Sequence, residues 1–322
     1  MSTSAAPRTT TTAMAAGPAV TTADGSEDAR PAWMERPKLP TRIGKGFALV
    51  VICLLVTVPF LVVLSTSLAS PEEVTENGGW VLFPTEPTLR AYEEILSGGT
   101  VTRALLVSVG VTVGGTLVSL VTTVALAYAL SRPHFSLRRP LLLMVLFTFL
   151  FPPAMLPSYL IVKNLGLLDS YWALVLPVAV NVFNLVVLRG FFQGLPEELY
   201  DAARIDGAGE LRTLVQVVLP LSKAVIAVVG LFYAVGYWNS FFHAVLYLDD
   251  STKWPLQAVL QTVITKGQAL GGNAGSIGDV ASTSPQTLQM ATVVIATVPI
   301  LIVYPFVQRY FTKGVLTGAI KS

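Results

Sequence analysis

The residues whose types and spacing are most informative lie between Gly194 and Pro220. Pro196 suits the first position of a helix, where its missing amide hydrogen costs nothing. Acidic residues follow it, and negative charge is stabilised at the positive end of a helix dipole; they are Glu197, Glu198 and Asp201. We therefore expect a short, charged helix to begin here. Its residue types suit contact with a partner rather than catalysis.

A glycine marks the end of that helix. Gly207 tolerates the left-handed conformation that terminates helices, so the helix should run to about Ile205. Asp206 could then cap a second helix that starts near Gly209 and runs to Pro220. The predicted product is a bent pair of helices with one polar end.

This bent pair is too polar to enter a bilayer and too short to be a domain. Ala202 and Ala203 remove side-chain bulk where the groove of a partner could close around the first helix, and the surrounding charges could fix its orientation. A docking element for a partner protein is one interpretation. An ordinary interfacial helix that links two membrane spans is the other, and the chemistry of these residues alone leaves both open.

A second group of polar residues lies within apolar sequence. Because unpaired polar side chains are disfavoured in hydrocarbon, such groups are candidates for a substrate path. Asn181 and Asn184 are three positions apart, which predicts that they share one helical face. Four further candidates, whose aromatic faces and polar groups would suit sugar rings, are adjacent in the chain: Tyr237, Trp238, Asn239 and Ser240. Hydrogen bonding between helices is the alternative role for all six.

Other site chemistry finds little support in the sequence. Cys53 is the only cysteine, which excludes an intrachain disulfide and a cysteine-based zinc site. His134 and His243 stand alone, without a second histidine or a carboxylate at metal-ligand spacing, and no GxSxG, HExxH, Walker loop or GxGxxG occurs. A net charge of +2 without Lys/Arg clusters among aromatics argues against nucleic acid. Catalysis and cofactor binding by this chain are not expected.

The elements that must position these residues are membrane helices. The chain of 322 residues is 53% hydrophobic and 12% charged, whereas soluble domains carry about a quarter charged residues. A spanning helix needs roughly 20 apolar residues. Six stretches reach about that length: Gly46–Ser70, Ala104–Ser131, Pro140–Val162, Ser170–Leu188, Ala224–Leu248 and Leu288–Val307. The predicted fold class is an all-α membrane protein with six transmembrane helices, the bent polar pair lying between the fourth and the fifth.

Two local features bear on how these helices pack. Small residues four positions apart permit close helix contacts, and Gly110 with Gly114 is such a pair, as is Gly230 with Ala234. The alternative explanation for these pairs is that glycine and alanine are simply common in membrane helices. The Pro152-Pro153 pair should kink the third span, because proline lacks an amide donor and clashes with the preceding turn.

The distribution of basic residues predicts the orientation. Residues 1–41 are rich in Thr, Ala and Pro and are expected to form a disordered tail. The first span exceeds the apolar core of a signal peptide, so we expect an uncleaved anchor. The tail, the second-to-third and fourth-to-fifth connections and the C-terminus carry 16 Lys and Arg, against five on the other side. Both termini and the bent pair are therefore expected in the cytoplasm.

The bent pair also carries a family resemblance. Asp201-Ala202-Ala203, three residues, Gly207, nine residues and Val217-Val218-Leu219-Pro220 resemble the EAA loop of binding-protein-dependent ABC importer permeases, whose pattern is EAA, three residues, Gly, nine residues, I-x-L-P. All spacings match, with Asp201 in place of Glu and Val217 in place of Ile. Asp201 keeps the charge but shortens its reach.

The resemblance extends from about Ile43 to the C-terminus, so residues 42–322 would form the permease domain. The stretch 203–208 is typical of the carbohydrate branch, and the run from Gln308 to Lys321 is similar to the C-terminus of MalG-type permeases. Residues 232–240 and 254–257 resemble the LplC-type subgroup, which is linked with complex oligosaccharides, including those that contain uronic acids.

The resemblance implies how the chain would work. ATP and Mg would be bound by a cytoplasmic partner, and the EAA loop would couple that ATPase to the membrane helices through eight residues: Asp201, Ala202, Ala203, Arg204, Asp206, Gly207, Leu219 and Pro220. The implied partners are a second homologous permease, two copies of the ATP-binding subunit, an extracellular solute-binding protein or lipoprotein, and membrane lipid. The implied location is a bacterial inner or plasma membrane, with the sugar passing between the two permeases.

Three alternatives remain at this point. A secondary transporter should carry charged residues within its spans, and none lies in the central part of the six. A scaffold protein would give no ATP-dependent flux, and a channel should show a charged ring or a filter motif.

The connection from Asp249 to Thr287 would contact the solute-binding protein by resemblance, or would be a flexible spacer around Gly271, Gly272, Gly275 and Gly278.

Overall fold

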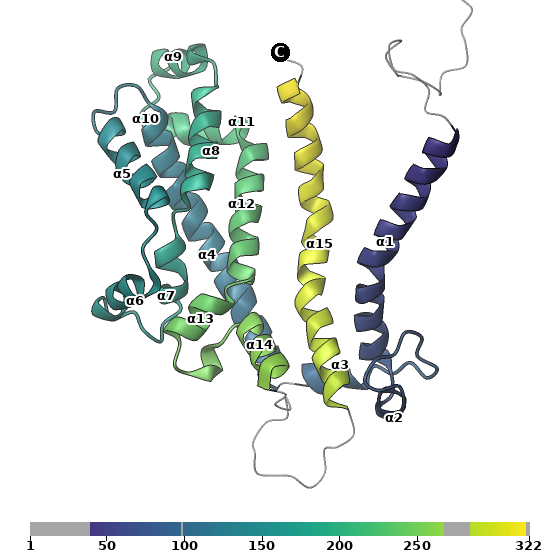
Figure 1. The fold of residues 1–322 in the computed structure, drawn as a ribbon. Coiled ribbons are helices and arrows are strands. Elements are labelled where there is room, and N and C mark those ends of the chain that lie inside the picture. Colours follow the sequence, from purple (N-terminus) through teal and green to yellow (C-terminus); the bar gives the residue numbers. More distant parts are fainter. Residues whose placement is uncertain (1–38, 98, 267–283, 320–322) are drawn as a thin grey trace, which may run out of the picture. The chain divides into compact units, whose positions relative to one another are not determined.

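The computed structural model describes residues 39–97, 99–266 and 284–319, and every regular element in these ranges is helical (Figure 1). The elements up to the third predicted span are α1 (Leu39–Leu68), α2 (Pro71–Glu76), α3 (Arg90–Leu96), α4 (Thr100–Ser131), α5 (Arg138–Leu150) and α6 (Met155–Asn164). The next are α7 (Trp172–Val175), the 3-10 turn η1 (Leu176–Val178), α8 (Val182–Gln193), α9 (Glu197–Ile205), α10 (Glu210–Thr213), the π-helical turn η2 (Leu214–Val218) and α11 (Leu219–Leu221). The last are α12 (Lys223–Trp238), α13 (Phe241–Tyr247), the 3-10 turn η3 (Ser251–Lys253), α14 (Leu256–Lys266) and α15 (Pro285–Ala319).

The chain divides into two units, one up to Leu55 and one from Val56 onward. The described part of the first unit is the N-terminal half of α1. Its apolar side chains are exposed, as expected of a helix that lies in lipid. Most of the predicted tail and the glycine-rich part of the 249–287 connection lie outside the described residues. All further elements belong to the second unit.

Three described helices are long and apolar enough to cross a membrane, over Ile43–Leu68, Thr100–Ser131 and Pro285–Pro305. Two bent pairs also qualify if each is one span: Trp172–Val178 with Val182–Gln193, bent by 52°, and Glu210–Leu221 with Lys223–Trp238, bent by 87°. The expectation of several apolar spans in an all-helical chain is confirmed. The count of six stays a prediction.

The third predicted span is not one helix. α5 ends at Leu150 and α6 begins at Met155, with Pro152 and Pro153 between them. Neither helix reaches the roughly 20 residues that a straight crossing needs. The proline pair was expected to kink a continuous helix, and it instead separates two, because neither proline can donate a helical hydrogen bond.

The fourth and fifth predicted spans are also interrupted. Asn181 is the N-cap of α8, and its Oδ1 accepts a hydrogen bond from the amide of Asn184 (3.1 Å), so the two asparagines do not share one face of a continuous helix. α12 ends at Trp238, where the Asn239 side chain donates to the Val235 carbonyl (2.9 Å). Side chains that bond to nearby backbone compete with the helical ladder, which accounts for both breaks.

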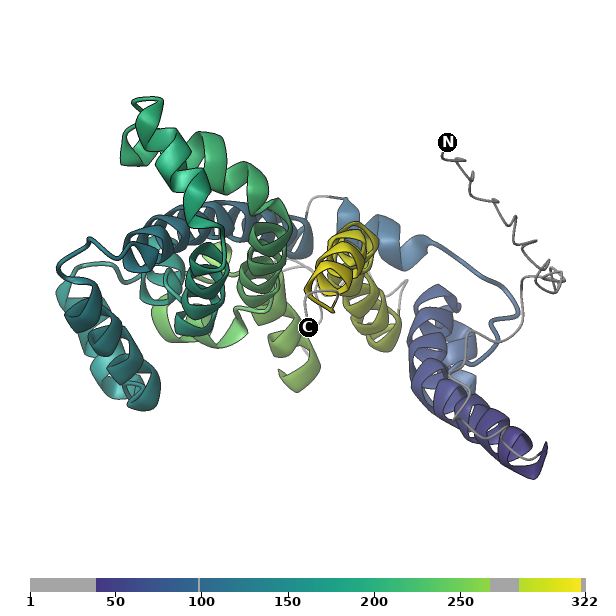
Figure 2. The ribbon, with the colours of Figure 1, turned by 90° about the horizontal axis from the view of Figure 1, so that it is seen from above.

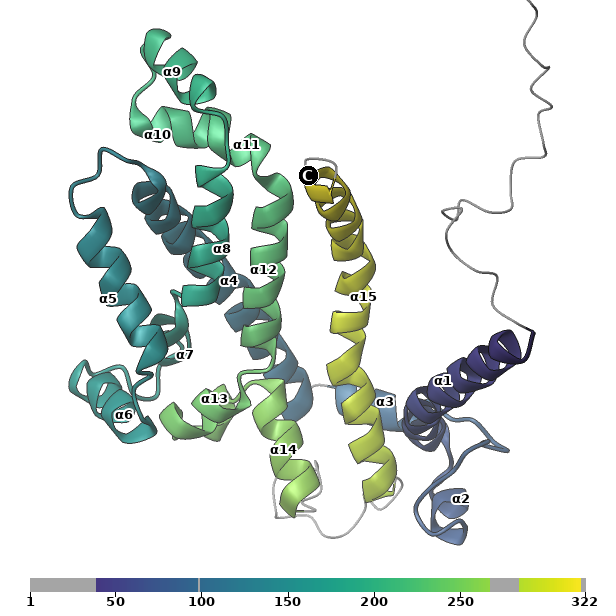
Figure 3. The ribbon, with the colours of Figure 1, turned by 45° about the horizontal axis from the view of Figure 1, so that its top comes forward.

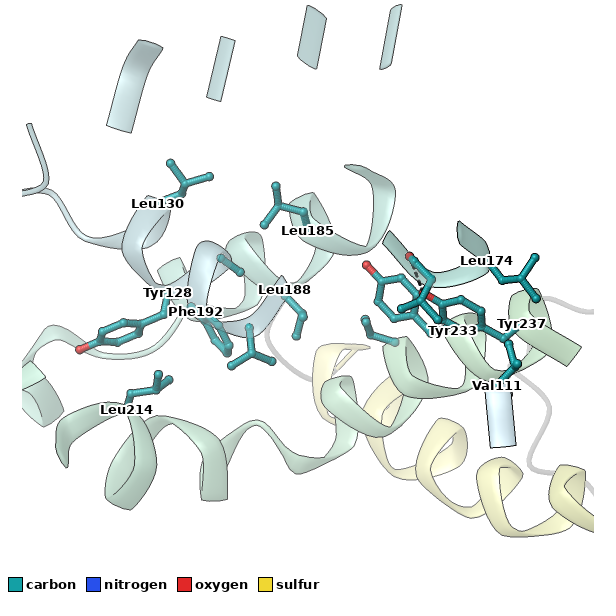
Figure 4. Close-up of a cluster of buried hydrophobic side chains, with 14 of the residues drawn as sticks. Val111, Tyr128, Leu130, Leu174, Leu185, Leu188, Phe192, Leu214, Tyr233 and Tyr237 are labelled. Carbon is teal, nitrogen blue, oxygen red and sulfur yellow. Dashed lines mark hydrogen bonds between the residues drawn. The ribbon is translucent and has the colours of Figure 1, made fainter. Parts of the chain in front are cut away.

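The core of the second unit forms around α4, which contacts α8 and α12 along its length. Figure 4 shows Tyr128, Phe192 and Leu214 at one end of this core and Tyr233 and Tyr237 at the other. Figure 1 shows α9 and α10 at one end of α4, α8 and α12, with α13 and α14 at the other. The candidate docking element and the candidate substrate residues are therefore attached to the same three helices.

Candidate functional site

The first part of the site is the α9–α10 turn, defined as residues 197–213. α9 begins directly after Pro196, with Glu197 and Glu198 in its first turn, and ends at Ile205. Gly207 has a φ of 74°, and the amide of Ala208 donates to the carbonyl of Ala203 (2.9 Å). A left-handed glycine with this hydrogen bond is the predicted way to end a helix. The predicted end of α9 at Ile205 is confirmed, and its start lies one residue later than expected, with Pro196 as the N-cap.

The second arm of the turn differs from the expectation in two ways. The N-cap of this arm is Gly209, which has no side chain to cap it. The prediction that Asp206 caps this arm is therefore wrong, and Asp206 is instead the C-cap of α9. The arm also changes from α-helix to a π-helical turn at Leu214 before it reaches α11. Figure 3 shows α9 and α10 beyond the end of α8, and the end-on view of Figure 2 shows the segment extending to one side.

The structure exposes most of the predicted coupling residues. Asp201 and Arg204 form an exposed ion pair of 3.1 Å, one turn apart on α9. The other exposed members are Ala202, Asp206, Gly207 and Pro220. Ala203 is buried against the protein and Leu219 is half-buried, so these two support the turn from inside.

Two apolar residues of the turn escaped the sequence reasoning. Ile205 is 87% exposed and Leu211 is 76% exposed, one on each arm. Large apolar side chains at the tip of a charged element make this surface a candidate for contact with a partner. Their position beside Asp206 and Glu210, in a segment too short to form its own core, was the available signal.

Tyr200 fixes α9 to the bundle. Its ring is buried, and its hydroxyl donates to the carbonyl of Phe192 at the end of α8 (3.1 Å). Burial raises the pKa of the Tyr200 phenol above its usual value, so the hydroxyl keeps its proton. The turn is therefore exposed on one side and attached through a tyrosine on the other.

The second part of the site is a pocket of ≈ 470 Å³ beside the two helix breaks, here called the tyrosine pocket. Its polar lining residues are Asn181, Asn184, Tyr233, Tyr237, Ser240 and His243. Four of the six predicted substrate-path residues are thus brought together. Trp238 is not among the lining residues, since it is buried and donates to the Ala296 carbonyl of α15 (3.0 Å), and neither is Asn239. Tyr233 and His243 were not predicted: His243 stands alone in the sequence, and Tyr233 was named only as part of the stretch 232–240.

Most hydroxyls at the tyrosine pocket already have partners within the chain. Tyr233 Oη lies 2.7 Å from Thr123 Oγ1 and accepts from the amide of Asn181 (2.9 Å). Tyr237 Oη lies 2.7 Å from Ser119 Oγ. Ser240 Oγ is buried and has no hydrogen-bond partner among the described residues. A buried hydroxyl without a partner is costly, so a polar group that reached this atom would be favoured there.

Metal binding finds no support in the described ranges, where no group of three His, Cys, Asp or Glu side chains could hold an ion. The arrangement is instead one of neutral hydrogen-bonding groups and aromatic rings in a pocket, joined through the bundle to an exposed turn. Such a combination is suited to binding and conformational coupling rather than to catalysis.

Comparison with known proteins gives this arrangement a family. Residues 117–317 match the model of the binding-protein-dependent transport system inner membrane component. The chain belongs to this family. The match contains both the α9–α10 turn and the tyrosine pocket, and it makes the chain a transporter permease rather than an enzyme.

Two relatives from Bacillus subtilis (strain 168) resemble this permease over most of its length. The polygalacturonan/rhamnogalacturonan transport system permease protein YtcP is 46% identical over 277 residues, which are 86% of this chain and 96% of YtcP. Protein LplC is 47% identical over 264 residues, 82% of this chain and 89% of LplC. A chain in the crystal structure of a bacterial ABC transporter involved in the import of the acidic polysaccharide alginate is 31% identical, with a TM-score of 0.80, and the match covers 86% of this chain and all of that one.

Proposed function

We propose that this chain is the permease subunit of an ABC importer for oligosaccharides and forms half of the translocation pathway. The observation that carries the proposal is the exposed α9–α10 turn, with Gly207 at a φ of 74°, in a chain that belongs to the inner membrane family. A charged and apolar tip held outside the bundle suits contact with a second protein.

The partner at the turn is the cytoplasmic ATP-binding subunit. Asp201 and Arg204 would orient the contact, while Ile205 and Leu211 would be buried in it. Desolvated apolar side chains surrounded by charge are typical of interface centres. ATP and Mg bind to that subunit, of which two copies serve this permease and a second, homologous one; the permease itself holds no cofactor.

The substrate class follows from the relatives and the pocket. YtcP is named for polygalacturonan and rhamnogalacturonan, and the alginate importer carries an acidic polysaccharide. We infer that this importer takes oligosaccharides containing uronic acids. The tyrosine pocket would contact their hydroxyls through Asn181, Asn184 and Ser240, with Tyr233 and Tyr237 as aromatic walls.

The orientation belongs to the same proposal. The excess of Lys and Arg on one side of the predicted spans supports a topology in the inner or plasma membrane of a bacterial cell with both termini and the α9–α10 turn on the cytoplasmic side. The opposite end, with α13, α14 and the 249–287 connection, would then face an extracellular solute-binding protein or lipoprotein.

Reconstitution tests the proposal. The permease is purified with the ATPase and the second permease that co-purify with it, placed in proteoliposomes with the solute-binding protein outside, and given labelled oligogalacturonate. We expect uptake that requires internal ATP and all the subunits. Uptake driven by an ion gradient without the ATPase would identify a secondary transporter instead, and the absence of any ATP-dependent flux would leave a scaffold role.

A further inference from the structure

Arg132 lies where three elements of the permease meet. It follows α4 directly as the C-cap of that helix, and its side chain is only 12% exposed. The guanidinium carbon lies 3.7 Å from the ring centroid of Tyr200, on α9 of the turn. It also lies 5.8 Å from the ring of Tyr128, in the last turn of α4. A guanidinium at these distances is attracted to the faces of both rings.

The third element is α10, which closes this contact from the other arm of the turn. Tyr128 Oη donates a short hydrogen bond to Glu210 Oε2, and Arg132 Nε lies 3.9 Å from the same oxygen. Glu210 is the first residue of α10, whereas Tyr200 belongs to α9. The end of α4 therefore holds both arms of the turn, and Arg132 contacts a residue from each.

α4 continues this connection to the tyrosine pocket. It is one helix of 32 residues, and two of its hydroxyls bond to tyrosines that line the pocket. Ser119 pairs with Tyr237, and Thr123 pairs with Tyr233, both at 2.7 Å. Contiguous packing of this kind can carry coupling between sites when the elements have two arrangements. One described path from turn to pocket therefore runs through α4 alone, beside those that run through α8 and through α11 and α12.

We propose that Arg132 is a positioning residue that transmits movement of the α9–α10 turn to α4, and through α4 to the tyrosine pocket. The inference rests on the proposed function, since it needs an ATPase that moves the turn. Arg132 need not touch the ATPase, the nucleotide or the sugar. A planar guanidinium stacked on an aromatic ring fixes distance and orientation, which a lysine ammonium cannot do.

The test uses the complete transporter in proteoliposomes and measures ATPase binding, ATP hydrolysis and sugar uptake on the same preparation. Arg132→Gln and Arg132→Lys remove the stack, and the exposed neighbour Arg139→Gln is the matched control. We expect both Arg132 variants to keep the ATPase bound and hydrolysing, while uptake per ATP hydrolysed falls at least tenfold. Arg139→Gln should leave that ratio unchanged.

The partner ring gives a second, independent readout. Tyr200→Phe keeps the ring and should retain most coupling, whereas Tyr200→Leu should resemble Arg132→Gln. The double variant Arg132→Gln/Tyr200→Leu should be no worse than either single variant, because both remove one contact. Unchanged uptake per ATP in Arg132→Gln overturns the inference, as does a loss of assembly, hydrolysis and uptake in equal proportion. If the wild-type transporter itself shows no ATP-dependent uptake, the proposed function fails, which is a separate result.

Discussion

The ring of Tyr237 lies directly against Gly115, where α12 crosses α4. A Cβ at Gly115 would come within 2.8 Å of that ring, and the Tyr237 hydroxyl bonds to Ser119 one turn further along α4. Two helices in lipid have little hydrophobic drive to associate, so close approach and interhelical hydrogen bonds must hold them. Gly115 allows α12 to approach α4 closely, and Ser119 forms the hydrogen bond with Tyr237 across the contact.

Gly115→Ala should therefore destabilise the permease. The added methyl group must displace the Tyr237 ring, and overpacking of this kind costs about 1–3 kcal/mol. Gly114→Ala is the matched control, because a Cβ there meets no atom within 4 Å. The measurement is the apparent melting temperature in detergent. Equal melting temperatures for the two variants would contradict the packing argument.

Gly207→Val should abolish ATP-dependent uptake and leave membrane insertion intact. A β-branched residue at a φ of 74° is strained by about 1–2 kcal/mol, so the α9–α10 turn must change shape. Gly207→Asn should retain part of the activity, because asparagine tolerates the left-handed region. Gly190→Ala serves as the control, since Gly190 lies in α8, outside the turn, with open space around it. Normal uptake by Gly207→Val would count against the turn as the coupling element.

Ser240→Ala should weaken transport of the oligosaccharide without harming the fold. One hydrogen bond is worth about 0.5–1.5 kcal/mol, which corresponds to a roughly 2- to 10-fold rise in the apparent KM for uptake. Ser222→Ala is the control, because Ser222 is also buried, also has no partner in the described structure and lies outside the tyrosine pocket. If both variants transport equally well, the Ser240 hydroxyl does not contact the sugar.

The Asp169–Lys253 ion pair should stabilise the protein independently of pH between about 5 and 9. The hydrogen bond from Lys253 lowers the pKa of Asp169, and the same bond raises the pKa of Lys253. The stability that the Asp169 carboxylate contributes is lost only as pH falls through the lowered pKa of Asp169. The stability that the Lys253 ammonium contributes is lost only as pH rises through the raised pKa of Lys253. Both limits lie outside that interval.

Asp169→Asn tests this, since asparagine also accepts the φ of 58° found at Asp169. It should lower the melting temperature by the same amount at pH 5.5, 7 and 9, with the exposed Asp249→Asn as the control. A difference from wild type that grows or shrinks across this interval would show that another group titrates with the pair.

Labelling of single cysteines should establish the orientation. In a Cys53→Ser background, Ile205→Cys at the tip of the turn should react with an impermeant maleimide only from the cytoplasmic side. Thr252→Cys, exposed in the connection after α13, should react only from the outside. The reverse pattern would invert the proposed topology and remove the turn from reach of a cytoplasmic ATPase.

The sequence predicts those features whose causes are local. Pro196 and Gly207 mark the start and end of α9 through their own backbones, and Glu197 and Glu198 favour its first turn through their charge. Long apolar stretches likewise predict the uninterrupted α4. The breaks at Asn181 and Asn239 were not predicted, because the hydropathy of a stretch does not depend on whether a side chain bonds to its own helix.

Other features depend on neighbours that the sequence does not reveal. Gly110, Gly114 and Gly115 look alike in an apolar run, and only the third lies against an aromatic ring. His243 reads as a solitary residue until the fold places it beside Ser240 in the tyrosine pocket. Arg132 reads as one of several basic residues in a connection until α9 brings the Tyr200 ring over it.

The 87° bend at Ser222 determines what a displaced turn can do. Because the arm from Glu210 to Leu221 runs almost perpendicular to α12, a sideways push on the arm becomes a rotation of α12 rather than a slide along its axis. The lining of the tyrosine pocket that α12 supplies would then swing while its depth in the bilayer stays fixed. We therefore expect the pathway to open by rotation of α12, which would require no residue of α12 to leave hydrocarbon for water.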